Sequence, residues 1–226
     1  MTSQEKAPSL RKRLLNRFWK PLVAAWLQKP RRIHYKGLRL LVMPGVFHPG
    51  FFFSSKILAD FVLRQNLAGK RILDLGCGSG LVALCAAKKG AIVTATDISE
   101  AAVSCTRQNA AANQLDVEVL SSDLFDRLQG RYFDIIAVNP PSYKKEPRTA
   151  EERAWYAGTN YEYFQKFFSQ LKIVYREGTA VYIILSEECE LEDIVSIAYT
   201  NGFRLQPDSD YRRTGEKLTL YQVRSV

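Results

Sequence analysis

Histidine and cysteine are scarce in this chain of 226 residues, which holds two histidines and four cysteines. Cys77, Cys85, Cys105 and Cys189 form no C-x-x-C pair. A structural zinc site is usually built from closely spaced ligands of these types, so we expect no metal site. Nothing in the sequence indicates export, and thiols of cytoplasmic proteins stay reduced. We therefore expect a cytoplasmic protein with free cysteines.

Long apolar runs are also missing. The longest uncharged apolar stretch near the start spans residues 21–28, whereas a membrane-spanning helix needs about 20 residues. Basic residues precede this stretch, as in a signal peptide, but Lys29, Arg31 and Arg32 follow at once without a small-x-small cleavage pattern. We therefore expect neither a membrane span nor an export signal. Disorder is excluded too, because 46% of the residues are hydrophobic and 12% are aromatic.

Acidic residues are nearly absent from the first 39 positions. Residues 1–39 hold eleven basic residues and one acid, Glu5, whereas the rest of the chain has a net charge of −1. We expect a basic N-terminal extension over residues 1–44, a helix followed by a short hairpin, and one domain over residues 45–226. A basic segment of this kind can contact nucleic acid, an acidic protein or a membrane surface, or can be only a solvated helix face.

The spacing of apolar residues predicts the first elements of the chain. A helical pattern covers residues 10–28, and residues 31–42 have the pattern of two short strands around a Lys-Gly turn. Residues 44–50 form a loop rich in proline and glycine. A helix with one apolar face follows, and we expect Ser54 or Ser55 to cap its N-terminus.

Strand and helix patterns alternate regularly from residue 71 onward. The expected strands are 71–75, 91–96, 116–120, 133–138, 179–186, 202–206 and 217–224. The expected helices are 80–89, 99–113, about 160–173 and 190–201. Such alternation predicts an α/β fold, a Rossmann-like, seven-stranded, mostly parallel sheet with helices on both faces. Ligands of such sheets bind beyond the carboxyl ends of the strands, so functional residues should follow strands.

A glycine-rich segment, I-L-D-L-G-C-G-S-G, covers residues 72–80 and leads from a strand into a helix. Gly76, Gly78 and Gly80 allow sharp turns and let a ligand approach the backbone closely. The third glycine of the dinucleotide fingerprint G-x-G-x-x-G would fall at Leu81, and the phosphate-loop pattern is absent. By itself the segment could hold a dinucleotide, a nucleoside or nothing.

Three acids follow or end the neighbouring strands. Asp74 lies two positions before the first glycine, where a carboxylate suits an ammonium group better than a pyrophosphate, although it could also only cap a helix. Asp97 ends the second strand, 21 positions after Gly76, and can accept hydrogen bonds from both ribose hydroxyls. Asp123 can accept from an adenine amino group, while the next backbone N–H, of Leu124, faces a ring nitrogen.

Together these residues resemble the class I S-adenosylmethionine (SAM)-dependent methyltransferases, over roughly residues 45–224. The resemblance implies SAM as the cofactor, S-adenosyl-L-homocysteine as the product and no metal. It also implies a set of cofactor-binding residues, which are Asp74, Gly76, Cys77, Gly78, Gly80, Asp97, Ile98, Asp123, Leu124 and Asn139.

The fourth strand runs into Asn139-Pro140-Pro141-Ser142-Tyr143. The prolines fix the backbone and remove two N–H donors, so carbonyl oxygens and the Asn139 carboxamide oxygen remain as acceptors. A planar amide or exocyclic amine is a poor nucleophile, because its lone pair is delocalised. Acceptors that bind its hydrogens out of plane favour a pyramidal nitrogen with an available lone pair. A simple turn is the alternative interpretation of N-P-P.

The same residues resemble the N-P-P-Y motif of amino-methyltransferases. Those enzymes modify glutamine side chains in release factors (the HemK type), or adenine or guanine amino groups in DNA and RNA. In that family the aromatic residue packs against the target group; here Ser142 takes its place and Tyr143 is the nearest substitute. The resemblance implies that Asn139, Pro140, Pro141 and Tyr143 are catalytic residues.

The loop over residues 46–50 resembles a segment that closes over cofactor and substrate in this group. The resemblance implies acceptor contacts from Phe47 and Pro49, beside Tyr143 and Trp155. His48 could act as a general base, but a lone loop histidine is more often structural.

Three functions remain open from the sequence. The tail over residues 211–221 and the single-domain size look like the short HemK-type enzymes of archaea and eukaryotes, which favours glutamine N5 of a protein such as a release factor. The basic extension and residues 144–148, followed by Trp155 and Tyr156, favour adenine N6 or guanine N2 of RNA or DNA. A SAM-binding module without catalysis, or a nicotinamide-type Rossmann protein, is the third. We expect a macromolecular acceptor and no membrane partner; no feature indicates an oligomeric state.

Overall fold

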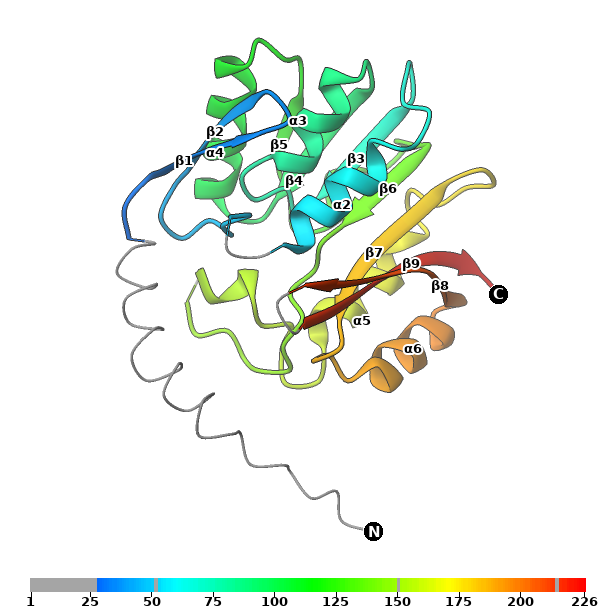
Figure 1. Cartoon of the computed structure of the whole chain (residues 1–226). Helices are drawn as coiled ribbons and strands as arrows, with labels where there is room; N and C mark the ends of the chain where they lie inside the picture. The colour runs from blue at the N-terminus through cyan, green and yellow to red at the C-terminus, as the bar shows by residue number, and fades with distance from the viewer. Residues whose placement is uncertain (1–27, 51–52, 150, 214–215) are drawn as a thin grey trace.

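The computed structural model describes residues 28–50, 53–149, 151–213 and 216–226 (Figure 1). The helix predicted over residues 10–28 therefore lies almost wholly outside the described residues. None of the helices within the described ranges is both long and apolar enough to cross a membrane.

A seven-stranded sheet forms the centre of the molecule, in the order β5-β4-β3-β6-β7-β9-β8. The strands are β3 (Arg71–Leu75), β4 (Ile92–Asp97), β5 (Glu118–Ser121), β6 (Ile135–Val138), β7 (Ala180–Ser186), β8 (Phe203–Arg213) and β9 (Glu216–Ser225). The five neighbouring strands β5, β4, β3, β6 and β7 are parallel to one another, whereas β9 is antiparallel to both β7 and β8. The chain order reverses between β3 and β6, which is where ligands bind in sheets of this type.

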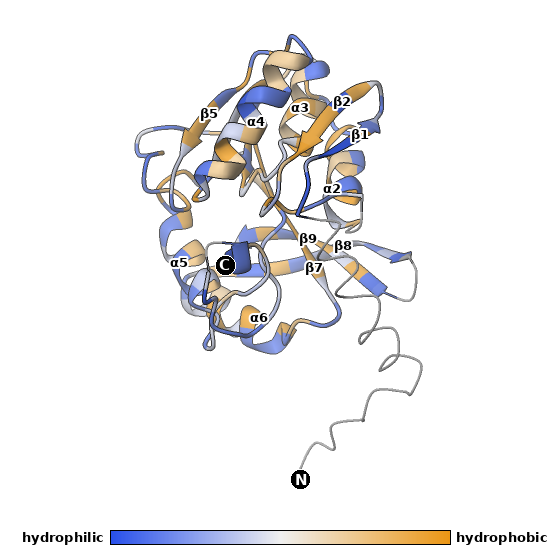
Figure 2. Cartoon of the chain, turned by 90° about the vertical axis from the view of Figure 1, so that its left-hand side faces the viewer, coloured by the Kyte–Doolittle hydropathy of each residue, from blue (hydrophilic) through white to orange (hydrophobic). Residues whose placement is uncertain are grey.

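Helices cover both faces of this sheet, as the strand–helix alternation predicts (Figure 2). The helices α2 (Ser54–Val62), α3 (Leu81–Lys88) and α4 (Glu100–Ala112) share one apolar core, and α5 (Glu162–Leu171) and α6 (Leu191–Thr200) share the other. Side chains alternate along β3, so Ile72 enters the first core and Leu73 and Leu75 enter the second. Asp74 therefore faces the side of the sheet that α3 covers.

A separate hairpin, β1 (Arg31–Tyr35) and β2 (Leu38–Val42), packs on the first of these layers. Leu38, Leu40 and Val42 are buried, in the alternation typical of a strand with one buried face. The Asn109 carboxamide of α4 accepts from the Leu41 N–H at 2.8 Å and donates to the Leu41 carbonyl at 2.9 Å. These two bonds tie the hairpin to helix α4.

Two local predictions were wrong. Neither Ser54 nor Ser55 caps α2: Phe53, with helical dihedral angles, is the N-cap residue and makes no side-chain capping bond. The helix therefore begins one residue earlier, and both serines lie in its first turn. Strand β8 is also longer than the stretch 202–206, because pairing with β9 continues beyond a register shift between Pro207 and Ser209.

Candidate active site

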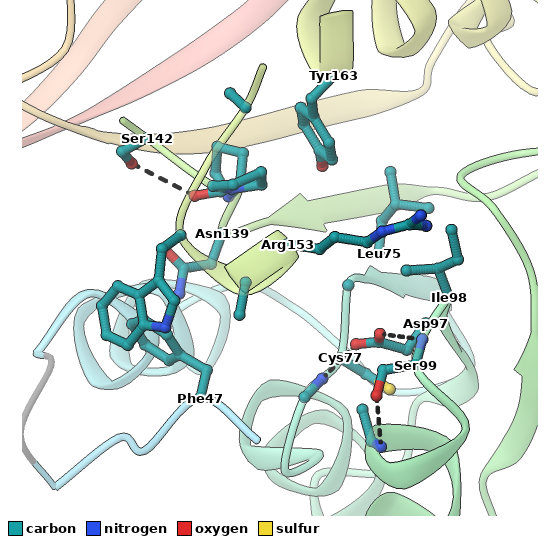
Figure 3. Close-up of a pocket in the computed structure, with 18 of the residues that line it drawn as sticks. Phe47, Leu75, Cys77, Asp97, Ile98, Ser99, Asn139, Ser142, Arg153 and Tyr163 are labelled. Atoms are coloured by element: carbon teal, nitrogen blue, oxygen red, sulfur yellow. Dashed lines mark hydrogen bonds between the residues drawn. The ribbon is translucent and has the colours of Figure 1, made fainter. Parts of the chain in front are cut away.

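A cavity of about 600 Å³ opens beyond the carboxyl ends of β3, β4 and β6 (Figure 3). It is lined by almost all of the residues singled out in the sequence: Phe47, Asp74, Gly76, Cys77, Gly78, Asp97, Ile98, Asp123, Leu124, Asn139, Pro140, Pro141, Tyr143 and Trp155. Gly80 and Pro49 do not line it. We call residues 74–78, 96–98 and 122–124 the glycine-loop half, and residues 45–47, 53–55, 139–143 and 153–157 the N-P-P half.

The glycine loop is held by the backbone of the neighbouring strand. The N–H groups of Gly76 and Cys77 both donate to the Thr96 carbonyl, at 2.8 and 2.9 Å. Gly76 has a φ of 76°, and a Cβ added there would lie more than 4 Å from any described residue other than its chain neighbours. A ligand can therefore approach this backbone directly. Gly80 differs, because a Cβ there would lie 2.9 Å from side-chain atoms of Leu84 and Thr106, so its role is close packing of α3.

Asp74 serves the fold and faces the cavity at the same time. Its Oδ2 accepts from the Ala83 N–H at 2.9 Å, in the first turn of α3, where a helix needs acceptors for its unpaired N–H groups. Burial of its side chain, together with the nearby carboxylate of Asp97, raises the pKa of the carboxyl from 3.8 to about 7, although the bond from Ala83 lowers it. Ionisation of Asp74 would be favoured by a cationic group in the cavity.

Asp97 is oriented by two backbone donors at the end of β4. Its Oδ1 accepts from the Ser99 N–H and its Oδ2 from the Gly78 N–H, both at 2.9 Å. Burial raises the pKa of this carboxyl even though these bonds lower it. Each oxygen has a further lone pair, so the carboxylate can bind a pair of hydroxyl groups. The side chain of Ile98, which is 42% exposed, lies beside it on the cavity.

Helix α5, which packs on the face of the sheet opposite to α3, lines the glycine-loop half of the cavity with the side chains of Tyr163 and Lys166. Lys166 Nζ lies 2.6 Å from Asp123 and 3.1 Å from Asp126. Tyr163 lines the cavity, and its pKa is raised by burial and then by the carboxylates of Asp97 and Asp123. Neither Tyr163 nor Lys166 could be assigned to the site from the sequence, because a polar position in an amphipathic helix does not indicate what that side chain will face.

Asn139, Pro140 and Pro141 form the floor of the N-P-P half at the end of β6. The Asn139 Nδ2 group donates to the Ser55 hydroxyl at 3.0 Å. Among the described residues no donor is bonded to the Asn139 Oδ1 atom, and the two prolines that follow have no N–H to offer. The Ser142 hydroxyl donates to the Pro140 carbonyl at 3.3 Å, which leaves that oxygen a second lone pair.

The segment after N-P-P folds back over the cavity. Ser142 and Tyr143 donate from their backbone N–H groups to the Trp155 carbonyl, and Ala157 donates to the Tyr143 carbonyl. These bonds close the base of the segment and bring the Trp155 ring to 4.9 Å from the Phe47 ring, centroid to centroid. Two of the three predicted acceptor-contacting aromatic residues therefore meet, although 108 positions separate them in the chain.

Tyr143 lies at the mouth of this half and is 38% exposed. Burial of part of its side chain, followed by the carboxylate of Glu188, raises the pKa of its hydroxyl. The ring stands edge-on to Tyr156 at 6.5 Å. Tyr143 is therefore an uncharged aromatic wall of the cavity.

His48 is buried and does not line the cavity. Its Nδ1 accepts from the Gly50 N–H at 3.1 Å, and burial lowers the pKa of its ring. This geometry fits a neutral histidine that shapes the loop, the role the sequence favoured.

Three further cavity-lining residues could not be identified from the sequence. Ser55 was considered only as a helix cap. Thr96, near the end of β4, has a buried Oγ1 atom with no hydrogen-bond partner among the residues that the structure describes. Arg153 belongs to a short 3₁₀ helix (Glu151–Ala154) and extends across the cavity toward Leu75 and Ile98 (Figure 3).

The family model for the methyltransferase small domain matches residues 37–202, most of the chain. The chain belongs to this family and is a SAM-dependent methyltransferase of the class I fold. A candidate protein N5-glutamine methyltransferase of Methanocaldococcus jannaschii is 28% identical over 197 residues, which cover 83% of this chain and 96% of that protein.

A second relative is a ribosomal RNA small subunit methyltransferase C of Alcanivorax borkumensis, which is 32% identical over 110 residues. These residues cover 48% of this chain but only 34% of that relative, so the chain spans about a third of its length. Among solved structures, a T. thermophilus 16S rRNA N2 G1207 methyltransferase in complex with AdoMet and guanosine matches with a TM-score of 0.62 at 20% identity. The match covers 86% of this chain and 50% of that one, and it shows the shared fold.

Proposed function

We propose that this enzyme methylates the side-chain amide nitrogen of a glutamine in a protein. The observation that carries the proposal is the state of Asn139: its Nδ2 is held by Ser55 while its Oδ1 has no donor among the described residues. The cavity therefore offers acceptors, and not donors, at the point where the strand β6 ends. A nitrogen with two hydrogens is the substrate that such a set of acceptors fits.

SAM supplies an electrophilic methyl group on a sulfonium. The residues present fit this cofactor: Asp97 has two oriented oxygens for the ribose hydroxyls, and Gly76 leaves open space for close approach. The buried carboxyl of Asp74 suits the ammonium group, and the Thr96 hydroxyl has no hydrogen-bond partner within the described ranges of the chain. Asp123 and Leu124 would take the adenine edge, with Ile98 against its ring.

The protein's part in the reaction is to orient the acceptor nitrogen. Asn139 Oδ1 and the Pro140 carbonyl accept its two N–H hydrogens, which draws those hydrogens out of the amide plane. The lone pair then loses its delocalisation and points toward the methyl group. As the N–C bond formed, the S–C bond would break to leave S-adenosyl-L-homocysteine, and one N–H proton would leave through the bonded acceptor oxygens to solvent. The rings of Phe47 and Trp155, together with Tyr143, exclude water around the amide. Such preorganised acceptors act through positioning and electrostatics alone.

The charges around the cavity support a protein acceptor. Leaving aside the acids that would hold SAM and the Asp123–Lys166 ion pair, Glu146, Glu162 and Glu216 stand against Arg153 in its wall. A nucleic acid acceptor would bring phosphates, which such a wall repels. The M. jannaschii relative also supports a protein acceptor, since the match covers 96% of that relative.

A nucleic acid base is the second candidate, supported by the basic residues 1–39 and by the rRNA methyltransferase relative. The stretch over residues 144–148 supports it less than its composition implies. Lys144 Nζ lies 2.7 Å from Glu190 and 2.6 Å from Asp193, and Lys145 Nζ lies over the Tyr156 ring at 4.3 Å. Both lysines have partners within the protein.

Transfer of labelled methyl from SAM into desalted cell extract tests the proposal. Label that survives nuclease but becomes acid-soluble after protease digestion is the expected result. Label lost with nuclease would replace the proposal with the RNA or DNA alternative. If the purified protein binds SAM but transfers no label to any fraction, the catalytic proposal is wrong.

A further inference from the structure

Ser55 lies at the active site for a reason that helix formation does not explain. It is the second residue of α2 and so lies inside the helix, whereas the N-cap position, where serine is favoured, is held by Phe53, which makes no side-chain capping bond. The Ser55 hydroxyl accepts from Asn139 Nδ2 at 3.0 Å, across 84 positions of the chain. Both residues line the cavity, and Figure 3 shows Asn139 directed into it.

A carboxamide has an acceptor end and a donor end that are nearly the same in shape. If the Asn139 amide turned by 180°, Nδ2 would replace Oδ1 and present N–H groups to the N–H groups of the acceptor. The reaction requires the unturned orientation, in which Oδ1 faces the acceptor nitrogen. Pro140 and Pro141 cannot hold either end by a backbone N–H, because they have none. Among the described residues, the one hydrogen bond to this carboxamide runs from Nδ2 to the Ser55 hydroxyl oxygen, so this bond selects the orientation when the hydroxyl accepts.

We propose that Ser55 is a positioning residue, whose hydroxyl holds the Nδ2 end of Asn139 so that Oδ1 faces the acceptor nitrogen. This inference rests on the proposed role of Asn139 in methyl transfer. Ser55 acts only through Asn139, so its removal should slow transfer without changing SAM affinity. Loss of one such hydrogen bond should slow the transfer about tenfold.

The test compares initial rates of labelled-methyl transfer from saturating SAM into desalted cell extract. Four full-length proteins are needed: wild type, Ser55→Ala, Asn139→Ala and the double variant. Ser55→Ala should lower the rate about tenfold in the wild-type background and not at all in the Asn139→Ala background. Ser55→Thr, which keeps the hydroxyl, should restore most of the rate. Ser196→Ala, on the exposed face of α6, controls for loss of a serine hydroxyl.

Calorimetric titration with SAM and thermal unfolding accompany the rates. The proposal is overturned if Ser55→Ala lowers the rate equally in both backgrounds, since Ser55 would then act independently of Asn139. It is also overturned if the rate falls in proportion to SAM affinity, or if Ser55→Ala transfers label at the wild-type rate. Absence of transfer by the wild-type protein would instead contradict the proposed function itself.

Discussion

The glycine-loop half and the N-P-P half of the cavity are built from different kinds of backbone. The first is formed by strand ends, with Asp74 and Thr96 buried and with backbone bonds from Gly76 and Cys77 to Thr96. The second is formed largely by two long loops that meet only through tertiary contacts, as in the Phe47–Trp155 ring pair. The glycine-loop half is therefore fixed by the sheet, while the N-P-P half depends on contacts between segments that are distant in the chain.

If the halves act separately, a change in the N-P-P half should affect transfer and spare cofactor binding. Asn139→Ala removes the Oδ1 acceptor, and loss of one oriented hydrogen-bonding group costs about 10²–10³ in rate. Single-turnover transfer from labelled SAM measures the rate, and calorimetry measures SAM affinity. Gln108→Ala, an exposed carboxamide on α4, is the control. A fully active Asn139→Ala protein would contradict the proposed mechanism.

A change in the glycine-loop half should have the converse effect, weakening SAM binding and sparing transfer. Asp97→Ala removes both oxygens expected to accept from the ribose hydroxyls, and hydrogen bonds to charged groups contribute about 1.5–3 kcal/mol each. We expect SAM affinity to fall about 10²-fold, while transfer at saturating SAM stays near the wild-type rate. Asp116→Ala, an exposed acid before β5, should bind SAM normally. An unchanged dissociation constant for Asp97→Ala would place the ribose elsewhere.

The glycine-loop half should also respond to pH through Asp74. Its pKa is raised from 3.8 to about 7 by burial and then by Asp97, so without SAM its contribution to stability is present below about pH 4 and is lost as the pH rises through 7. An ammonium group binds the ionised carboxylate. SAM affinity should therefore rise about tenfold between pH 6 and pH 8, and binding below pH 7 should release a proton.

Calorimetry in buffers of different ionisation enthalpy measures that proton. Asp74→Asn keeps an acceptor for the Ala83 N–H but cannot ionise, so it should bind SAM more weakly and without this pH dependence. A pH-dependent rise of equal size in Asp74→Asn would assign the titration to another group.

The smallest effect is expected at the aromatic pair. Trp155→Ala removes one ring of the Phe47–Trp155 contact, and an aromatic pair contributes about 0.5–1.5 kcal/mol. The KM for the macromolecular acceptor should rise several-fold, with SAM affinity unchanged. Tyr199→Ala is the control: it removes an aromatic ring of α6 that is 64% exposed and does not line the cavity. The KM of this variant should match that of the wild type. A fall in SAM affinity for Trp155→Ala would place this ring in the glycine-loop half.

The two halves also differ in how well the sequence predicts them. Glycines and acids at strand ends follow from local pattern, so the positions of Asp74, Gly76 and Asp97 at the cavity could be predicted from the sequence alone. Ser55 could not be placed, because its local pattern indicates a helix cap and only the packing of α2 beside β6 brings it to Asn139. Arg153 carries no local signal, since its position depends on the bonds that fold residues 142–158 over the cavity.

The chemical form of the transferred methyl group tests the central claim most directly. A methyl group on a glutamine amide nitrogen leaves as methylamine when the labelled protein fraction is hydrolysed in strong acid, because the amide bond breaks and the N-methyl bond does not. Most protein-bound label should be recovered as labelled methylamine, and Asn139→Ala should yield little. Label released as methanol from a carboxylate ester, or retained on a lysine or a nucleic acid base, would contradict the proposed function.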